Sequence, residues 1–136
     1  MDATTYAVQV EWGDCGPGNV VLVQSFARWM DEAAQQHFRQ RRAQIADHHA
    51  DPIELVAMPP LELNMSFYGA AAHPEALEIL TWVEEWREAA VVHRHRVLRG
   101  ATVICEGRSL RAFHVVGPEI APAPPPFPEW IRERIH

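Results

Sequence analysis

Apolar and polar residues alternate along much of this chain, which is the pattern of strands with one buried face. The five alternating stretches are residues 6–12, 61–68, 77–86, 90–99 and 102–116. Arg87-Glu88 predicts the connection between the third and fourth strands, and Gly100 predicts a hairpin turn before the fifth. Gly107 interrupts the fifth stretch and predicts a β-bulge there.

The longest helix pattern of the chain lies between the first and second strands. No proline or glycine occurs from Val20 until Pro52, which ends the helix near residues 46–49. Apolar residues recur at the spacing of one buried helix face. They are Leu22, Phe26, Trp29, Met30, Ala33, Ala34, His37 and Phe38. One strand, a long helix and four consecutive strands predict an α+β fold whose sheet edges are open to pairing with a second copy.

A glycine-rich turn, residues 13–19, comes directly before the helix. Its glycines let the backbone approach another group closely, and the first N–H groups of a helix have no partner within it. Together with the helix dipole, these N–H groups favour an anion or a polarised carbonyl. The alternative is an ordinary loop in which Asn19 caps the helix.

Composition narrows the class of protein. The 136 residues suit one domain, and the net charge of −6 argues against general nucleic-acid binding. All twelve basic residues are arginine, which excludes chemistry that needs a lysine. No apolar run approaches the roughly 18 residues of a membrane span, and the first residues lack a signal-peptide pattern. Cys15 and Cys105 indicate free thiols, and therefore a cytoplasmic location.

Three groups of residues resemble the hotdog-fold acyl-CoA thioesterases, in particular the 4-hydroxybenzoyl-CoA thioesterase family. They are Trp12–Gly18 with Phe26–Ala33, Asn64-x-Ser66-Phe67, and Glu85-Trp86-Arg87 followed by Val92–His95. The resemblance implies one long helix wrapped by a five-stranded antiparallel sheet, in a domain of residues 1–117. It also implies homodimers with a continuous ten-stranded sheet, often homotetramers, with sites at the dimer interface. The substrate would be an acyl-CoA or aryl-CoA thioester, with no cofactor besides that coenzyme A.

A proline-rich tail, residues 118–136, follows this domain. Its prolines favour an extended chain without a packed core of its own. Residues 130–135 predict a short terminal helix.

The chain departs from the family pattern at the catalytic carboxylate. The family's second aspartate of the turn, which acts as nucleophile or base at the thioester, corresponds to Gly16, whereas Asp14 is kept. Asp14 lies about 7 Å away along an extended turn, and it either substitutes for the missing group or ties the turn together. Asn19 either holds a water or serves as a cap or left-handed turn residue. Cys15 is a candidate thiol nucleophile, with an inert thiol as the alternative.

Thioester hydrolysis also needs donors for the developing oxyanion. These would be the backbone N–H groups of Leu22 and Val23, at the position of the family's aromatic pair. Backbone donors survive a change of side chain. The family meets the CoA phosphates with three consecutive basic residues, of which this chain keeps only Arg87, followed by Glu88 and Ala89.

Eight histidines raise the question of a metal site. The densest group is Asp47-His48-His49 with Asp51, but neighbouring helix residues point about 100° apart and do not chelate together. His93 and His95 share one face of a strand, which is a better geometry. The family-like strand carries a histidine at position 95 without a metal, so we expect no metal site.

Two functional hypotheses follow. The first is a hydrolase of acyl-CoA, or aryl-CoA, thioesters in which Asp14 or a water held by Asn19 replaces the carboxylate missing at Gly16. The second is a binding protein or silent paralogue that holds such a thioester without cleaving it. A hotdog dehydratase would need a histidine and a carboxylate on one substrate, and no spacing indicates that pair. Phe26, Trp29, Trp82 and Trp86 suit either an aryl pocket or the core.

Overall fold

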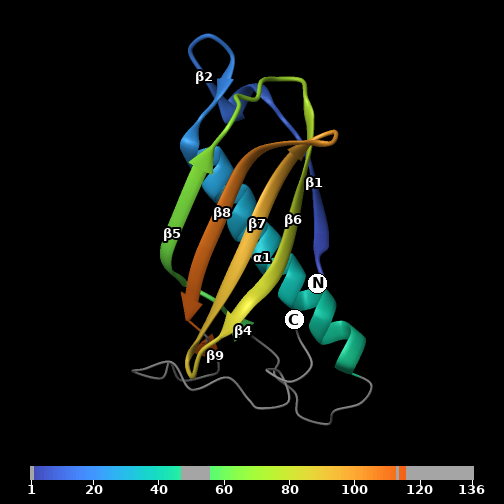
Figure 1. Ribbon diagram of the computed structural model, residues 1–136, viewed down its shortest axis with the longest axis vertical. Coiled ribbons are helices and arrows are strands. Elements are labelled where there is room, and N and C mark those ends of the chain that lie inside the picture. The colour runs from blue at the N-terminus through green and yellow to red at the C-terminus, as the bar shows by residue number, and fades with distance from the viewer. Residues whose placement is uncertain (1, 47–55, 113, 116–136) are drawn as a thin grey trace.

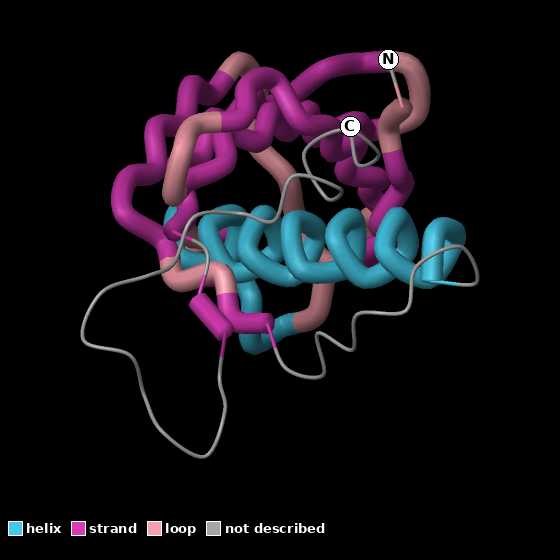
Figure 2. The backbone as a smooth tube through the Cα atoms, turned by 90° about the horizontal axis from the view of Figure 1, so that it is seen from below, coloured by secondary structure: helices cyan, strands magenta, loops and turns pink. Residues whose placement is uncertain are grey.

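One long helix packed against a curved antiparallel sheet makes up the body of the molecule (Figures 1 and 2). The computed structural model describes residues 2–46, 56–112 and 114–115, and the side chains of residues 2–41 and 58–112. The helix is α1 (Val23–Ala46), and the sheet has the order β1-β6-β7-β8-β5. Its strands are β1 (Thr4–Gln9), β5 (Pro60–Phe67), β6 (Ala76–Trp86), β7 (Ala90–Arg99) and β8 (Thr102–Ala112). This confirms the predicted α+β hotdog fold.

Short elements separate the first strand from the helix. A 3₁₀ turn, η1 (Trp12–Asp14), follows β1, and then β2 (Cys15–Gly16) pairs with β3 (Val20–Val21). The first strand therefore ends before Trp12, and the helix begins at Val23 because the chain at Val20 is still extended. A second small pair, β4 (Val56–Ala57) with β9 (His114–Val115), lies at the other end of the sheet (Figure 1).

The predicted apolar face of α1 does form the core with the inner face of the sheet. From Phe26 to Phe38, every helix residue of the predicted set is buried, and Leu22, just before the helix, is half-buried. Their neighbours in the core include Val8, Val10, Leu77, Ile79 and Val97. Burying a large apolar side chain contributes about 1.5 to 3 kcal/mol, so this face accounts for the position of the helix.

The predicted bulge at Gly107 is wrong. Gly107 pairs regularly with His95 on one side and Met65 on the other, and the register shift of this hairpin lies at Ile104 instead. At position 107, Met30 fills the space of a side chain, with its Cε 2.8 Å from the ideal Cβ position. The glycine therefore allows close packing of helix on sheet.

The two edges of the sheet differ. Along β1, the carbonyls of Ala3 and Thr5 accept hydrogen bonds from Arg41 and Gln36 of the helix, at 3.5 and 3.0 Å. Along β5, by contrast, large apolar side chains are exposed, including 58% of Leu61.

Among the described helices, none has the length and apolar content needed to cross a membrane. The predicted tail and its terminal helix lie outside the described residues.

Candidate functional site

The turn before α1 is tied to the helix through one carbonyl group. The Asp14 carbonyl oxygen accepts the Leu22 N–H at 3.0 Å and the Ser25 hydroxyl at 2.8 Å. The chain between these residues reverses at Gly18, which has φ +79°, and the Asn19 N–H closes the turn on the Gly16 carbonyl at 3.2 Å. Gly16 is therefore fixed next to the start of the helix.

The Asp14 carboxylate is buried and fully engaged within the turn. One oxygen accepts the Glu11 N–H at 2.8 Å, and the other pairs with the guanidinium of Arg28. Burial alone would raise the pKa of Asp14, but the hydrogen bonds from Glu11 and Arg28 and the positive charge of Arg28 outweigh it, so this pKa lies below its ordinary value. These contacts support the interpretation that Asp14 ties the turn together, and its catalytic role stays a prediction.

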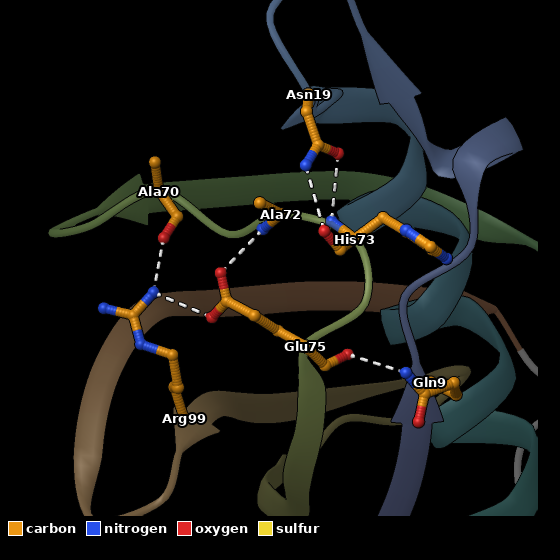
Figure 3. A network of polar contacts seen from close by, with 7 residues as sticks. All are labelled: Gln9, Asn19, Ala70, Ala72, His73, Glu75 and Arg99. Atoms are coloured by element: carbon orange, nitrogen blue, oxygen red, sulfur yellow. Dashed lines mark hydrogen bonds and ion pairs between the residues drawn. The ribbon is translucent and has the colours of Figure 1, made fainter.

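Asn19 joins the turn to the loop between β5 and β6 (Figure 3). Its side-chain amide donates to the His73 carbonyl at 2.9 Å and accepts the His73 N–H at 3.1 Å. Its φ of +57° confirms the left-handed turn residue, and it does not cap α1, which begins at Val23. Both polar atoms of the Asn19 side chain are already bonded to His73. Its role in holding a water stays a prediction.

Further contacts hold the same loop in place (Figure 3). The Glu75 carboxylate accepts the Ala72 N–H at 3.0 Å and pairs with Arg99 at 3.1 Å. Gln9 donates to the Glu75 carbonyl at 3.4 Å. The loop and the turn therefore form one cross-linked unit at this end of the sheet.

The two expected oxyanion donors differ in their availability. The Leu22 N–H is engaged by the Asp14 carbonyl, which corrects the prediction that both donors face a ligand. The N–H groups of Ser25 and Phe26 bond to the Leu22 carbonyl at 3.0 and 3.4 Å. Since the first N–H groups of a helix have no partner four residues earlier, Val23 and Gln24 provide the donors of the first turn.

A polar cleft of about 590 Å³ opens between β1, the turn and α1. The Tyr6 hydroxyl donates to Glu32 in this cleft, and that hydrogen bond, together with burial, raises the pKa of Tyr6. The charged residues of its lining are Glu11, Asp14, Arg28 and Glu32. Three carboxylates outnumber one guanidinium, so the cleft repels phosphate groups.

Arg87 lies far from the turn in its own protomer. It follows β6, whereas the cross-linked loop precedes that strand, so an 11-residue strand of roughly 35 Å separates them (Figure 1). The Arg87 side chain is about half exposed and pairs with Glu85 at 3.5 Å. A site that uses both Arg87 and Gly16 therefore draws on two copies of the chain.

A buried cluster of polar residues lies between α1 and the sheet, and sequence reasoning missed it. We call His37, His93, His95, Ser109 and Arg111 the polar cluster; all five are buried. His95 bridges Thr81 and Ser109 at 2.8 and 3.0 Å, and His37 contacts Thr4 at 2.9 Å.

The sequence did place His37 on the buried helix face and His93 with His95 on one strand face, but it gave no sign of Arg111. Within the described residues, no group of three or more His, Cys, Asp or Glu is arranged to hold a metal ion. The group Asp47-His48-His49 with Asp51 lies outside them.

The fold and this turn define a class of protein. A family model described as the thioesterase-like superfamily matches residues 10–135. The chain belongs to this family of hotdog-fold acyl-CoA and aryl-CoA thioesterases. It is 31% identical over 97 residues to the 4-hydroxybenzoyl-CoA thioesterase of Pseudomonas sp. strain CBS-3, a match that covers 70% of this chain and 67% of that protein.

Solved structures agree on the fold. An aspartate-to-asparagine mutant of 4-hydroxybenzoyl-CoA thioesterase, complexed with 4-hydroxybenzoyl-CoA, has a TM-score of 0.79 at 23% identity and covers 98% of this chain and 99% of that one. The gentisyl-coenzyme A thioesterase BH1999 has a TM-score of 0.75 at 18% identity and covers 97% and 98%. The resemblance inferred from the sequence motifs is thereby confirmed.

Proposed function

We propose that this protein hydrolyses acyl-CoA or aryl-CoA thioesters at the start of α1, with Gly16 in the place of the family's catalytic aspartate. The observation that carries the proposal is the bond from the Leu22 N–H to the Asp14 carbonyl, which holds Gly16 beside the first turn of the helix. Family membership and the 4-hydroxybenzoyl-CoA thioesterase relative support the substrate class.

In the proposed reaction, the thioester carbonyl oxygen accepts a hydrogen bond from the Val23 N–H. Water attacks the carbonyl carbon and gives up a proton to solvent, and the oxyanion is stabilised by this donor and by the positive end of the helix dipole. The C–S bond then breaks, and the leaving thiolate takes up a proton from solvent. The products are the free acid and the thiol of coenzyme A. Because no carboxylate stands at position 16 to take the proton from water, we expect slow turnover.

The second candidate function is binding without cleavage. It is favoured by the full engagement of the Asp14 carboxylate and the Asn19 amide, which leaves neither group ready to accept a proton. Cys15 is not placed as a nucleophile that could replace the carboxylate, since its half-buried thiol donates to the Glu11 carbonyl at 3.6 Å.

We also propose that the chain acts as a homodimer or homotetramer in the cytoplasm. The β5 edge, with Leu61, Phe67 and Tyr68 exposed, is the edge that suits pairing with a second copy. Such an assembly would let Arg87 of one copy meet the CoA phosphates of a ligand held by another. Light scattering at micromolar concentration should give at least twice the chain mass, and a monomer would contradict this proposal.

The function is tested with a panel of acyl-CoA and aryl-CoA esters, following release of free thiol and measuring ester binding in parallel. Proline is tolerated at the first position of a helix and has no N–H, so Val23→Pro removes the proposed donor. We expect it to lower kcat by roughly 100-fold, as loss of an oxyanion donor does, while leaving the fold intact.

The matched control is Val23→Ala, which shortens the side chain and keeps the N–H. It should retain the native rate to within a few-fold. Equal rates for Val23→Pro and the native protein would remove the helix start from the mechanism. Binding of CoA esters without any thiol release would favour the second candidate function.

A further inference from the structure

The space beside Gly16 is already filled. A Cβ atom built on Gly16 would lie 2.7 Å from Cδ2 and 3.5 Å from Cγ of Leu22. The first distance is well inside van der Waals contact. The Leu22 side chain therefore occupies the volume into which any side chain at position 16 would project.

The backbone holds these two residues in fixed relation. Gly16 pairs with Val20 in the β2–β3 ladder, and its carbonyl accepts the Asn19 N–H. Leu22 is held on both sides, by the Asp14 carbonyl at its N–H and by Ser25 and Phe26 at its carbonyl. Relief of the close approach must therefore come from rotation of the leucine side chain.

Two further observations show that the backbone requires neither glycine at position 16 nor leucine at position 22. The glycines with left-handed φ in the described part of the chain are Gly18 and Gly100, so the backbone at Gly16 can carry a side chain. Leu22 also stands just before the first helix residue, where serine, threonine, aspartate or asparagine would stabilise the helix by about 1 kcal/mol. A leucine there supplies no cap.

We propose that the Leu22 side chain determines whether a side chain fits at position 16, and that it thereby controls the activity of the site. The leucine side chain fills the space into which a carboxylate at position 16 would project. This inference rests on the proposed function as far as catalysis is concerned, whereas the packing can be tested without any thioester.

A carboxylate introduced beside the native leucine would be poorly placed. It would push Leu22 aside or be turned away from the helix start, and contact with the apolar side chain would remove water from it and raise its pKa. Gly16→Asp alone should therefore change the rate of thiol release by less than about 3-fold. With Leu22→Ala, the same aspartate should raise the rate by at least about 10-fold over the Leu22→Ala variant, as a positioned base does.

A cycle of melting temperatures tests the packing by itself. Gly16→Ala should lower Tm by about 3 °C in the native background, since overpacking is destabilising, and should not lower it in the Leu22→Ala background. Gly13→Ala is the matched control, because a Cβ on Gly13 meets nothing within 4 Å. It should leave Tm unchanged or slightly raised in both backgrounds.

The outcomes separate the two proposals. Equal Tm losses for Gly16→Ala in both backgrounds would overturn the role of Leu22, and so would a full rate gain from Gly16→Asp alone. If the Tm cycle behaves as expected but no variant cleaves or binds a CoA ester, then the proposed function fails while the packing of Leu22 on Gly16 stands. A Gly16→Asp/Leu22→Ala variant that binds CoA esters but gains no rate would show that position 16 is not a catalytic position.

Discussion

The turn before α1 and the polar cluster beneath it each bury a charged side chain, but the partners come from different distances along the chain. Asp14 is held by Glu11 and Arg28, 3 and 14 residues away. Arg111 is held by the carbonyl of Met58 and the carboxylate of Asp31, 53 and 80 residues away. The contacts of Asp14 are therefore local in sequence, whereas the cluster exists only once helix and sheet have come together.

The largest effect that separates these two regions should come from Arg111→Ala. The guanidinium is 2% exposed and donates to Asp31, Met58 and, at 3.4 Å, Ser109. Its removal leaves a cavity and unpaired acceptors, so we expect the free energy of unfolding to fall by about 3 to 5 kcal/mol. Denaturant unfolding measures this.

The partner variant Asp31→Asn is the control for charge. The Asp31 side chain is 49% exposed, and asparagine keeps an oxygen that can accept from Arg111. Because asparagine leaves the buried charge of Arg111 without its anionic partner, we expect a loss of about 1 to 3 kcal/mol, still smaller than that of Arg111→Ala. If Asp31→Asn cost as much as Arg111→Ala, the ion pair itself, and not the burial of Arg111, would be the main contribution.

The same contrast explains how much could be predicted from sequence. Periodicity placed the helix and the strands, and local glycines placed the turn. The hydrogen bond from the Leu22 N–H to the Asp14 carbonyl could not be predicted from sequence, because it depends on how β2 and β3 pair. Gly107 was misread as a bulge because nothing local shows that Met30 occupies its side-chain space. Arg111 stands between Leu110 and Ala112 on a predicted strand, so alternation places it on the polar face, and only the packed helix reveals that it is buried.

The second effect is a loss of stability in mild acid, contributed by the polar cluster. Burial, with the nearby histidines and Arg111, lowers the pKa of His93 well below its ordinary value. Burial, with the charge of Arg111 and His37, lowers the pKa of His95 to about 3. In the unfolded chain both histidines titrate near pH 6.5, so below that pH the unfolded state binds more protons.

The stabilisation contributed by the lowered pKa values of His93 and His95 is therefore present above pH 6.5 and lost as pH falls below it. Between pH 7.5 and 5.5 each histidine contributes about 1.4 kcal/mol of loss, while carboxylates stay ionised. The free energy of unfolding should fall by about 3 kcal/mol over this range, as measured by urea unfolding. His95→Gln, which does not titrate and can still bond to Thr81 and Ser109, should reduce the slope by about half. An unchanged slope would remove His95 as a cause.

The smallest effect should come from the turn, and in a different pH window. The pKa of Asp14 is lowered, so its stabilisation is present above the ordinary carboxyl pKa near 4 and is lost as pH falls through the folded value. Asp14→Asn keeps an acceptor for the Glu11 N–H but loses the charge opposite Arg28, whose side chain is 54% exposed.

Because that guanidinium is well solvated, we expect Asp14→Asn to cost only about 1 kcal/mol at pH 7. The variant should keep the native slope between pH 7.5 and 5.5, since the histidines are untouched, and should lose less stability than the native protein below pH 4. A change of slope in the upper window instead would mean that the turn and the polar cluster are coupled through α1, and that the two regions do not respond independently to acid.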